Sequence, residues 1–125
     1  RILPRYPTRD VISLVEDISG KLAKELNLSI SVEPHYRQDA PDPTPADAPV
    51  VRALEKAIRR VKGLDAKPMG IGGGTVAAFF RRVGLPVAVW ITTSDSAHQP
   101  NELCLISDII SDAKVFACLY LDQYK

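Results

Sequence analysis

The chain has 125 residues, enough for one small domain or two partial ones, and its 46% hydrophobic content is ordinary for a globular protein. Its 16 basic and 15 acidic residues are mixed along the chain and leave a net charge of +1, so we expect no nucleic-acid partner. The longest apolar run, near residues 87–91, is too short to span a membrane.

The two cysteines, Cys104 and Cys118, do not form a paired metal-binding motif. Free, half-buried thiols are typical of proteins in a reducing cytosol, so we expect a cytoplasmic protein without a disulfide framework. The chain lacks an initiator methionine, and its opening residues read as if they were already inside a strand. We therefore expect it to be the end of something longer.

Residues 1–40 predict a strand, a helix and a second strand. The first strand, residues 1–5, is stopped by Pro4 and Pro7, and Thr8 suits a helix N-cap. Apolar residues then recur at helical spacing as far as position 26, and Asn27 ends the pattern. Residues 28–36 alternate apolar and polar side chains in the manner of a half-buried strand.

A proline-rich connector at residues 41–49 is the only plausible domain boundary, because four prolines make this stretch stiff and extended. Beyond it, residues 50–125 predict an amphipathic helix closed at Gly63 and a glycine loop, GIGGGT, at residues 70–75. Next come a short helix capped by Thr75, a solidly apolar strand, LPVAVWI, and a final helix from about Ser107.

This order of elements predicts an α/β fold. A strand that is apolar at every position, such as residues 85–91, is typical of a parallel sheet covered on both faces. Such a strand needs strand neighbours, and residues 50–125 offer few. We therefore expect that a partner chain supplies the rest of the sheet, or that the chain is a fragment.

The glycine loop does not match the nucleotide-binding motifs. The dinucleotide fingerprint requires a glycine where Thr75 stands, and a P-loop requires a lysine after the last glycine. A tight turn is the ordinary interpretation, although amides before a helix could also bind a carboxylate or another anion.

Taken together, GIGGGT, a short helix, an apolar strand, AHQPNE at residues 97–102 and a closing helix resemble the C-terminal part of a known family. This is the family of two-zinc amide hydrolases that includes acetylornithine deacetylase, succinyl-diaminopimelate desuccinylase and carboxypeptidase G. RILPR, residues 1–5, with the helix, strand and connector that follow, is similar to the second half of that family's lid, or dimerisation, domain. The resemblance implies an α+β lid piece followed by part of a zinc-peptidase-like α/β sheet domain.

The resemblance implies that His98 is a metal ligand, in a centre of two zinc ions for which cobalt or manganese could substitute. A neutral imidazole is a good zinc ligand, and its second nitrogen needs a partner that fixes the tautomer. Asp95 and Glu102 are both near enough in sequence to serve, and Asn101 is a further supporting candidate.

The resemblance also implies roles in substrate binding. Arg1 corresponds to an arginine that grips the substrate carboxylate, and Gly73, Gly74 and Thr75 correspond to the loop whose amides lie near it. Many relatives carry an acid just after the threonine, whereas this chain has an apolar run at residues 76–79, which puts the choice of substrate in doubt. His35 is interpreted as an ordinary residue near a strand end.

The family's other metal ligands and its glutamate base belong to an N-terminal half that this sequence does not contain. We therefore expect an enzyme that cleaves an N-acyl amino acid or small peptide only with its missing half, as a homodimer through the lid, and an inactive isolated chain. The alternatives are a stand-alone dimerising interaction module without catalysis, and an anion- or nucleotide-binding domain built on GIGGGT.

Overall fold

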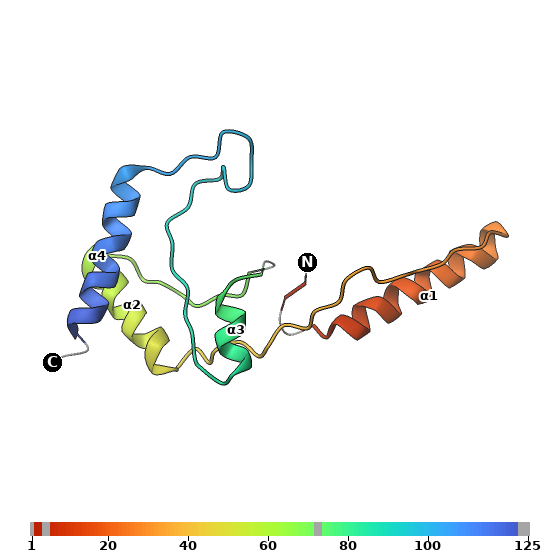
Figure 1. The fold of residues 1–125 in the computed structure, drawn as a ribbon, viewed down its shortest axis with the longest axis horizontal. Helices are drawn as coiled ribbons and strands as arrows, with labels where there is room; N and C mark the ends of the chain where they lie inside the picture. The colour runs from red at the N-terminus through yellow and green to blue at the C-terminus, as the bar shows by residue number, and fades with distance from the viewer. Residues whose placement is uncertain (1, 4–5, 72–73, 123–125) are drawn as a thin grey trace. The chain divides into compact units, whose positions relative to one another are not determined.

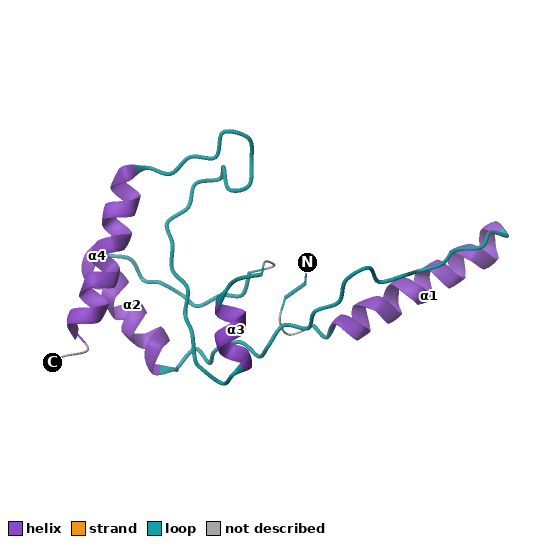
Figure 2. Cartoon of the chain, viewed as in Figure 1, coloured by secondary structure: helices purple, strands orange, loops and turns teal. Residues whose placement is uncertain are grey.

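The computed structural model describes residues 2–3, 6–71 and 74–122. In these ranges the chain forms four helices, α1 (Thr8–Leu26), α2 (Pro49–Lys62), α3 (Ala77–Arg82) and α4 (Ile106–Asp122), joined by extended segments (Figures 1 and 2). These described ranges contain no β-strand, so the α/β class expected from the sequence is not confirmed. No helix in them is both long and apolar enough to cross a membrane.

The segments predicted as strands are extended but unpaired. Residues 1–5 lie largely outside the described residues, whereas residues 28–36 and 85–91 are drawn as loops (Figure 2). A strand exists only through hydrogen bonds to a neighbouring strand, and the described chain supplies no such neighbour. The apolar pattern therefore predicted the extended backbone correctly, whereas the sheet is not confirmed by the described residues.

The contacts within the chain define two units. One comprises Arg1–Pro43 and Gly70–Arg82, and the other comprises Thr44–Met69 and Val83–Lys125. The division falls inside the proline-rich segment 41–49, and the glycine segment belongs to the first unit. The predicted domains, 1–40 and 50–125 with their connector, stay a prediction.

In the first unit, α1 has no buried residue although its sequence is amphipathic. Its apolar side chains, among them Leu14, Ile18 and Leu22, are exposed in the described structure. The chain turns at Asn27, whose φ of 51° is left-handed, and residues 28–38 return along α1 (Figure 1). The helix therefore presents an apolar face that the described residues do not cover.

Two predicted N-caps are wrong in position. The N-cap of α1 is Pro7 and makes no side-chain capping bond, while Thr8 is already the first helical residue. Pro7 already has the extended backbone of an N-cap, so the helix can begin at Thr8 without a hydroxyl cap. α3 begins at Ala77, and Thr75 contacts its first turn through a backbone carbonyl that accepts the Ala78 N–H.

Asp39 connects the two ends of the α1 segment. Its carboxylate accepts the backbone N–H of Thr8 at 3.1 Å, although the two residues are 31 positions apart. Hydrogen bonding from the Thr8 side chain and then from its backbone, together with the nearby Arg37 guanidinium, lowers the pKa of Asp39 below its ordinary value.

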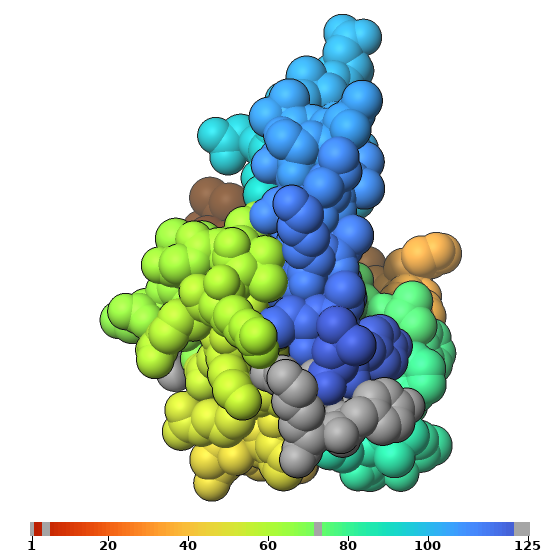
Figure 3. Space-filling model, turned by 90° about the vertical axis from the view of Figure 1, so that its left-hand side faces the viewer, coloured from red at the N-terminus to blue at the C-terminus, as the bar shows by residue number. Residues whose placement is uncertain are grey.

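The second unit contains a small hydrophobic core between α2 and α4, which contact each other (Figure 3). The predicted apolar stripe of α2 is confirmed, because Val51, Leu54, Ala57 and Ile58 are all buried. Val115 of α4 packs against them and is completely buried. Gly63 ends α2 in the left-handed conformation that its predicted capping role requires, with φ of 67°.

Residues 85–92 run beside this core with only one side covered. Ala88 and Trp90 pack against the core, while Val89 and Ile91 are 60% and 65% exposed. The hydroxyl of Thr44 donates to the carbonyl of Val87 at 2.7 Å and accepts its N–H at 3.0 Å. Thr44 thus satisfies backbone groups that a strand partner would otherwise bind, and the outward face of the segment remains exposed.

Candidate functional site

The AHQPNE motif lies in a loop of residues 94–103 that is closed at its neck by two serines. The Ser94 and Ser96 hydroxyls are hydrogen bonded to each other at 2.5 Å. Both reach the carbonyl of Leu103, at 3.1 and 3.4 Å, and the N–H of Leu103 donates to Ser96 Oγ at 3.2 Å. The two ends of the loop are therefore joined by side chains rather than by a backbone ladder.

His98 occupies the exposed part of this loop. Its φ of 62° is left-handed, a conformation that costs free energy for a residue with a Cβ and is often found at functional sites. Its backbone N–H donates to the Glu102 carboxylate at 3.2 Å. The imidazole forms no hydrogen bond or ion pair with any described residue, so both of its nitrogens are available.

The loop brings together the predicted supporting residues, but their contacts differ from those expected. Glu102 holds the backbone of His98 rather than its ring. Asp95 contributes its backbone carbonyl, which accepts the side-chain amide of Gln99 at 2.7 Å. Asn101 is left-handed, with φ of 62°, and shapes the turn after His98. A role for any of these three side chains at a metal stays a prediction.

The described residues fit one ligand of a metal centre but not a complete centre. An exposed imidazole with unpaired nitrogens suits zinc, cobalt or manganese. However, no group of three or more His, Cys, Asp and Glu side chains that could hold a metal occurs in residues 2–3, 6–71 and 74–122. A centre that includes His98 must therefore take its other ligands from residues beyond these.

The predicted substrate-binding residues are only partly described. Arg1 and Gly73 lie outside the described residues. Gly74 is exposed and has open space around its Cα, and Thr75 is half-buried before α3. This segment belongs to the first unit, whereas the His98 loop belongs to the second. The role of Gly74 and Thr75 at a substrate carboxylate stays a prediction.

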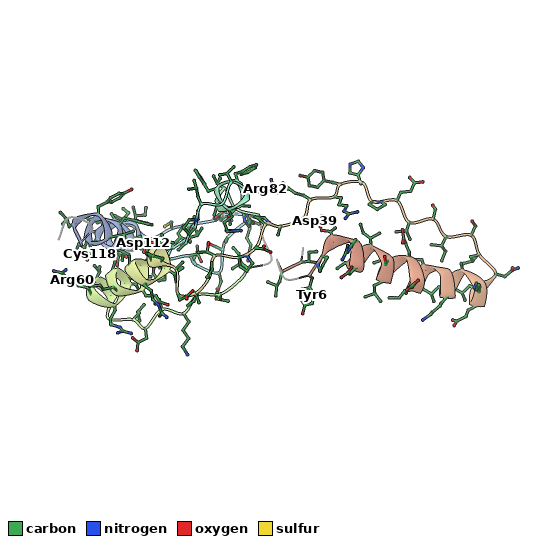
Figure 4. The ribbon with its side chains drawn as sticks, turned by 90° about the horizontal axis from the view of Figure 1, so that it is seen from below. Tyr6, Asp39, Arg60, Arg82, Asp112 and Cys118 are labelled. Atoms are coloured by element: carbon green, nitrogen blue, oxygen red, sulfur yellow. The ribbon has the colours of Figure 1, made fainter. Side chains whose placement is uncertain are left out.

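A buried polar cluster in the second unit was missed by sequence reasoning. The carboxylate of Asp112, on α4 (Figure 4), accepts hydrogen bonds from the Thr92 N–H at 2.6 Å, the Thr92 hydroxyl at 2.7 Å and the Trp90 indole at 3.0 Å. Lys62 at the end of α2 lies 3.3 Å from the same carboxylate, and its ammonium is 5.5 Å from the centre of the Trp90 ring. The cluster fastens the extended segment 85–92 to both helices.

Burial raises the pKa of the Asp112 carboxyl, but hydrogen bonds from Thr92, Trp90 and Lys62 outweigh it and lower the pKa to about 2 from 3.8. Asp112 therefore stabilises the folded state fully above about pH 4, and this stabilisation is lost as the pH falls from the unfolded value towards about 2. The signal in the sequence was an aspartate within the apolar stripe of the last helix.

We expect the pH dependence of unfolding to report this carboxylate. At neutral pH the wild type should have a larger free energy of unfolding than Asp112→Asn. This difference between the two proteins should become smaller by about 2 kcal/mol at strongly acid pH, where the carboxylate is protonated. The measurement is urea denaturation of both proteins from pH 7 to pH 2. A difference that is the same at every pH would show that the ionised carboxylate is not the stabilising species.

The two cysteines are free and separate. Cys118 is half-buried against the core, as expected, whereas Cys104 is exposed.

Sequence comparisons relate the chain to metallohydrolases. An uncharacterized metallohydrolase of Methanocaldococcus jannaschii is 40% identical over 124 residues, covering 93% of this chain and 30% of that protein. Another, from Methanococcus maripaludis, is 35% identical and covers 100% of this chain and 32% of its own length. A succinyl-diaminopimelate desuccinylase of Sulfurovum sp. is 32% identical over 86% of this chain and 27% of that protein.

The chain thus spans about a third of the length of the curated relatives that it matches. No solved structure matches it. The sequence model of peptidase family M20/M25/M40 matches residues 4–122, which includes the glycine loop, the His98 loop and all four helices. The relatives and this match confirm the resemblance seen in the motifs: the chain belongs to peptidase family M20/M25/M40.

Proposed function

We propose that this chain is the C-terminal portion of a metal-dependent hydrolase that cleaves the amide bond of an N-acyl amino acid or a small peptide. The observation that carries the proposal is His98, a free imidazole on an exposed loop closed by its own side chains. Membership of the M20 peptidase family and the metallohydrolase and desuccinylase names of the relatives support hydrolysis with a metal.

In this proposal His98 donates a nitrogen lone pair to a centre of two metal ions, probed first as zinc. The chemistry that such ions would supply there is a lowered pKa of bound water and polarisation of the amide carbonyl. The remaining ligands and the general base come from the part of the protein beyond this chain. The isolated chain should therefore bind metal weakly and turn over no substrate.

The glycine segment provides the proposed contact with the substrate. Gly74 is exposed and its missing side chain leaves open space, so a carboxylate could approach the backbone there. Thr75 and, outside the described residues, Arg1 and Gly73 would complete this contact. The exposed apolar residues that follow, Val76 and Phe79, favour a substrate with an apolar portion over one that needs a further charged contact.

A second candidate function is a dimerising interaction module, which the uncovered apolar face of α1 favours. Leu14, Ile18 and Leu22 are between 44% and 57% exposed along one helix. Association of two copies through the first unit would remove this surface from water. In the hydrolase the same association would make the homodimer, whereas in the module it would be the whole function.

Metal removal and substrate assay separate these functions. We expect the complete protein to carry about two metal ions per chain, to lose amide hydrolysis after chelation, and to recover it with zinc, cobalt or manganese. The substrates are a panel of N-succinyl and N-acetyl amino acids and dipeptides. A metal-free complete protein that dimerises without hydrolysing any of them would replace the hydrolase by the interaction module.

A further inference from the structure

The backbone of His98 needs a specific restraint because it lies in the left-handed region with a Cβ present. That restraint is visible in the loop itself. The carboxylate of Glu102 accepts the His98 N–H at 3.2 Å across four residues. The N–H of Glu102 in turn donates to the Gln99 carbonyl at 3.1 Å, which holds the carboxylate-bearing residue against the turn.

The Ser94–Ser96 pair restrains the same loop at its neck, where the two ends of the loop meet. Each hydroxyl has one proton, so one serine donates to the Leu103 carbonyl while the other donates to its partner. The second lone pair of Ser96 remains free to accept the Leu103 N–H at 3.2 Å. Both hydroxyls and both backbone groups of Leu103 are thereby satisfied within the loop.

The loop is held by these bonds rather than by packing. Residues 94–103 are almost all exposed, and none of them is buried. An exposed loop without a core beneath it keeps one shape only if its own hydrogen bonds specify that shape. The bonds converge on the backbone on either side of His98, while the imidazole itself stays unpaired.

Resting on the proposed role of His98 as a metal ligand, we infer that Glu102 and the Ser94–Ser96 pair are positioning residues that shape the loop before metal binds. Glu102 acts through the backbone N–H of His98 and not through the imidazole or the metal. A ligand held in place in advance loses less conformational freedom on binding, so the metal is bound more tightly.

The Glu102 variants test the way in which this residue acts. In the complete protein, Glu102→Ala should weaken the affinity for Zn²⁺ about tenfold or more, a range typical of groups that support a ligand. Glu102→Gln should stay within about threefold of the wild type, because its amide oxygen can still accept the His98 N–H. Zinc affinity is measured by competition with a chromophoric chelator, and Glu33→Ala, an exposed glutamate elsewhere, is the matched control.

Amide exchange supplies a readout that does not depend on metal. In the metal-free complete protein, the His98 amide should exchange about tenfold faster in Glu102→Ala than in the wild type or in Glu102→Gln. An unchanged exchange rate in the alanine variant would overturn the inference. Equal weakening of zinc binding by the alanine and glutamine variants would also overturn it, because the charge of Glu102 would then act on the ring or on the metal.

The serine pair is tested by the double variant Ser94→Ala with Ser96→Ala, with Ser29→Ala as the control. The Leu103 and His98 amides should both exchange about tenfold faster, and zinc affinity should fall about tenfold. If these amides exchanged at the wild-type rate in the double variant, a positioning role for the serines would be excluded.

His98→Ala separates failure of this inference from failure of the proposed function. If His98→Ala binds zinc as tightly as the wild type, the ligand assignment itself fails. If it loses zinc while Glu102→Ala and the double serine variant keep wild-type affinity, only the positioning role fails.

Discussion

Replacement of His98 by alanine in the complete protein is expected to remove one metal ion per chain and to lower amide hydrolysis roughly a thousandfold or more. The imidazole is a good zinc ligand and forms no hydrogen bond or ion pair with any described residue, since only the backbone N–H of His98 is engaged, by Glu102. Its removal leaves a metal with one ligand fewer. Metal content by atomic emission and turnover of an N-acyl amino acid measure the two effects.

The matched control is His35→Ala, the other histidine of the chain, which is exposed in the extended segment after α1. It should keep full metal content and activity. Comparable losses in both variants would indicate a general effect on folding, and full metal content in His98→Ala would refute the ligand assignment.

Replacement of Asp112 by alanine is expected to lower the free energy of unfolding by about 3 kcal/mol. The change leaves the Thr92 N–H, the Trp90 indole and the Lys62 ammonium without the carboxylate that they share. Unpaired half-buried donors are costly because the protein shields them from water, and the Lys62 ammonium would keep the Thr92 hydroxyl, at 2.6 Å, but lose the carboxylate that balances its charge. The segment 85–92 should also lose its attachment to α4, since this carboxylate binds it at Trp90 and at Thr92.

Urea denaturation of the complete protein measures the change in the free energy of unfolding. The rate of amide exchange at Thr92 measures the local loss of stability in the segment 85–92. Asp112→Asn should cost less than the alanine variant, because the amide oxygen still accepts one of the bonds while the charge is lost. The control is Asp47→Ala, an exposed aspartate of the same unit, which should change the unfolding free energy by less than about 0.5 kcal/mol. If Asp112→Ala changed the free energy of unfolding as little as this control does, the cluster would not stabilise this unit.

The sequence was informative wherever structure is local. Apolar spacing located α2 and its buried face at Leu54 and Ile58, and the glycine at position 63 marked its end. These features depend on helical periodicity and on one residue's freedom at positive φ, both of which are readable in a short window. The polar loop around His98 was also predicted from its residues, and its resemblance to a family motif is confirmed by the family match.

What the sequence did not specify is which partner an extended segment or a polar side chain finds in the folded chain. Residues 85–91 were predicted as a strand covered on both faces, yet Val89 and Ile91 are exposed and the described chain offers no strand to pair with. Hydrophobicity reports that a segment is suited to burial, but burial itself requires a second surface. Glu102 was considered as a partner of the His98 ring, and only the geometry of the turn directs its carboxylate to the backbone N–H instead.

From the residues alone one could predict the helices, the extended segments between them and the family. The tertiary structure alone decided the cluster of Lys62, Trp90, Thr92 and Asp112, whose members are up to 50 residues apart. It also decided how the serine pair and Glu102 shape the His98 loop. The physical reason is that helix and turn preferences act between near neighbours, whereas polar side chains acquire partners, and carboxyl groups their pKa, only when the folded chain places their atoms within hydrogen-bonding distance.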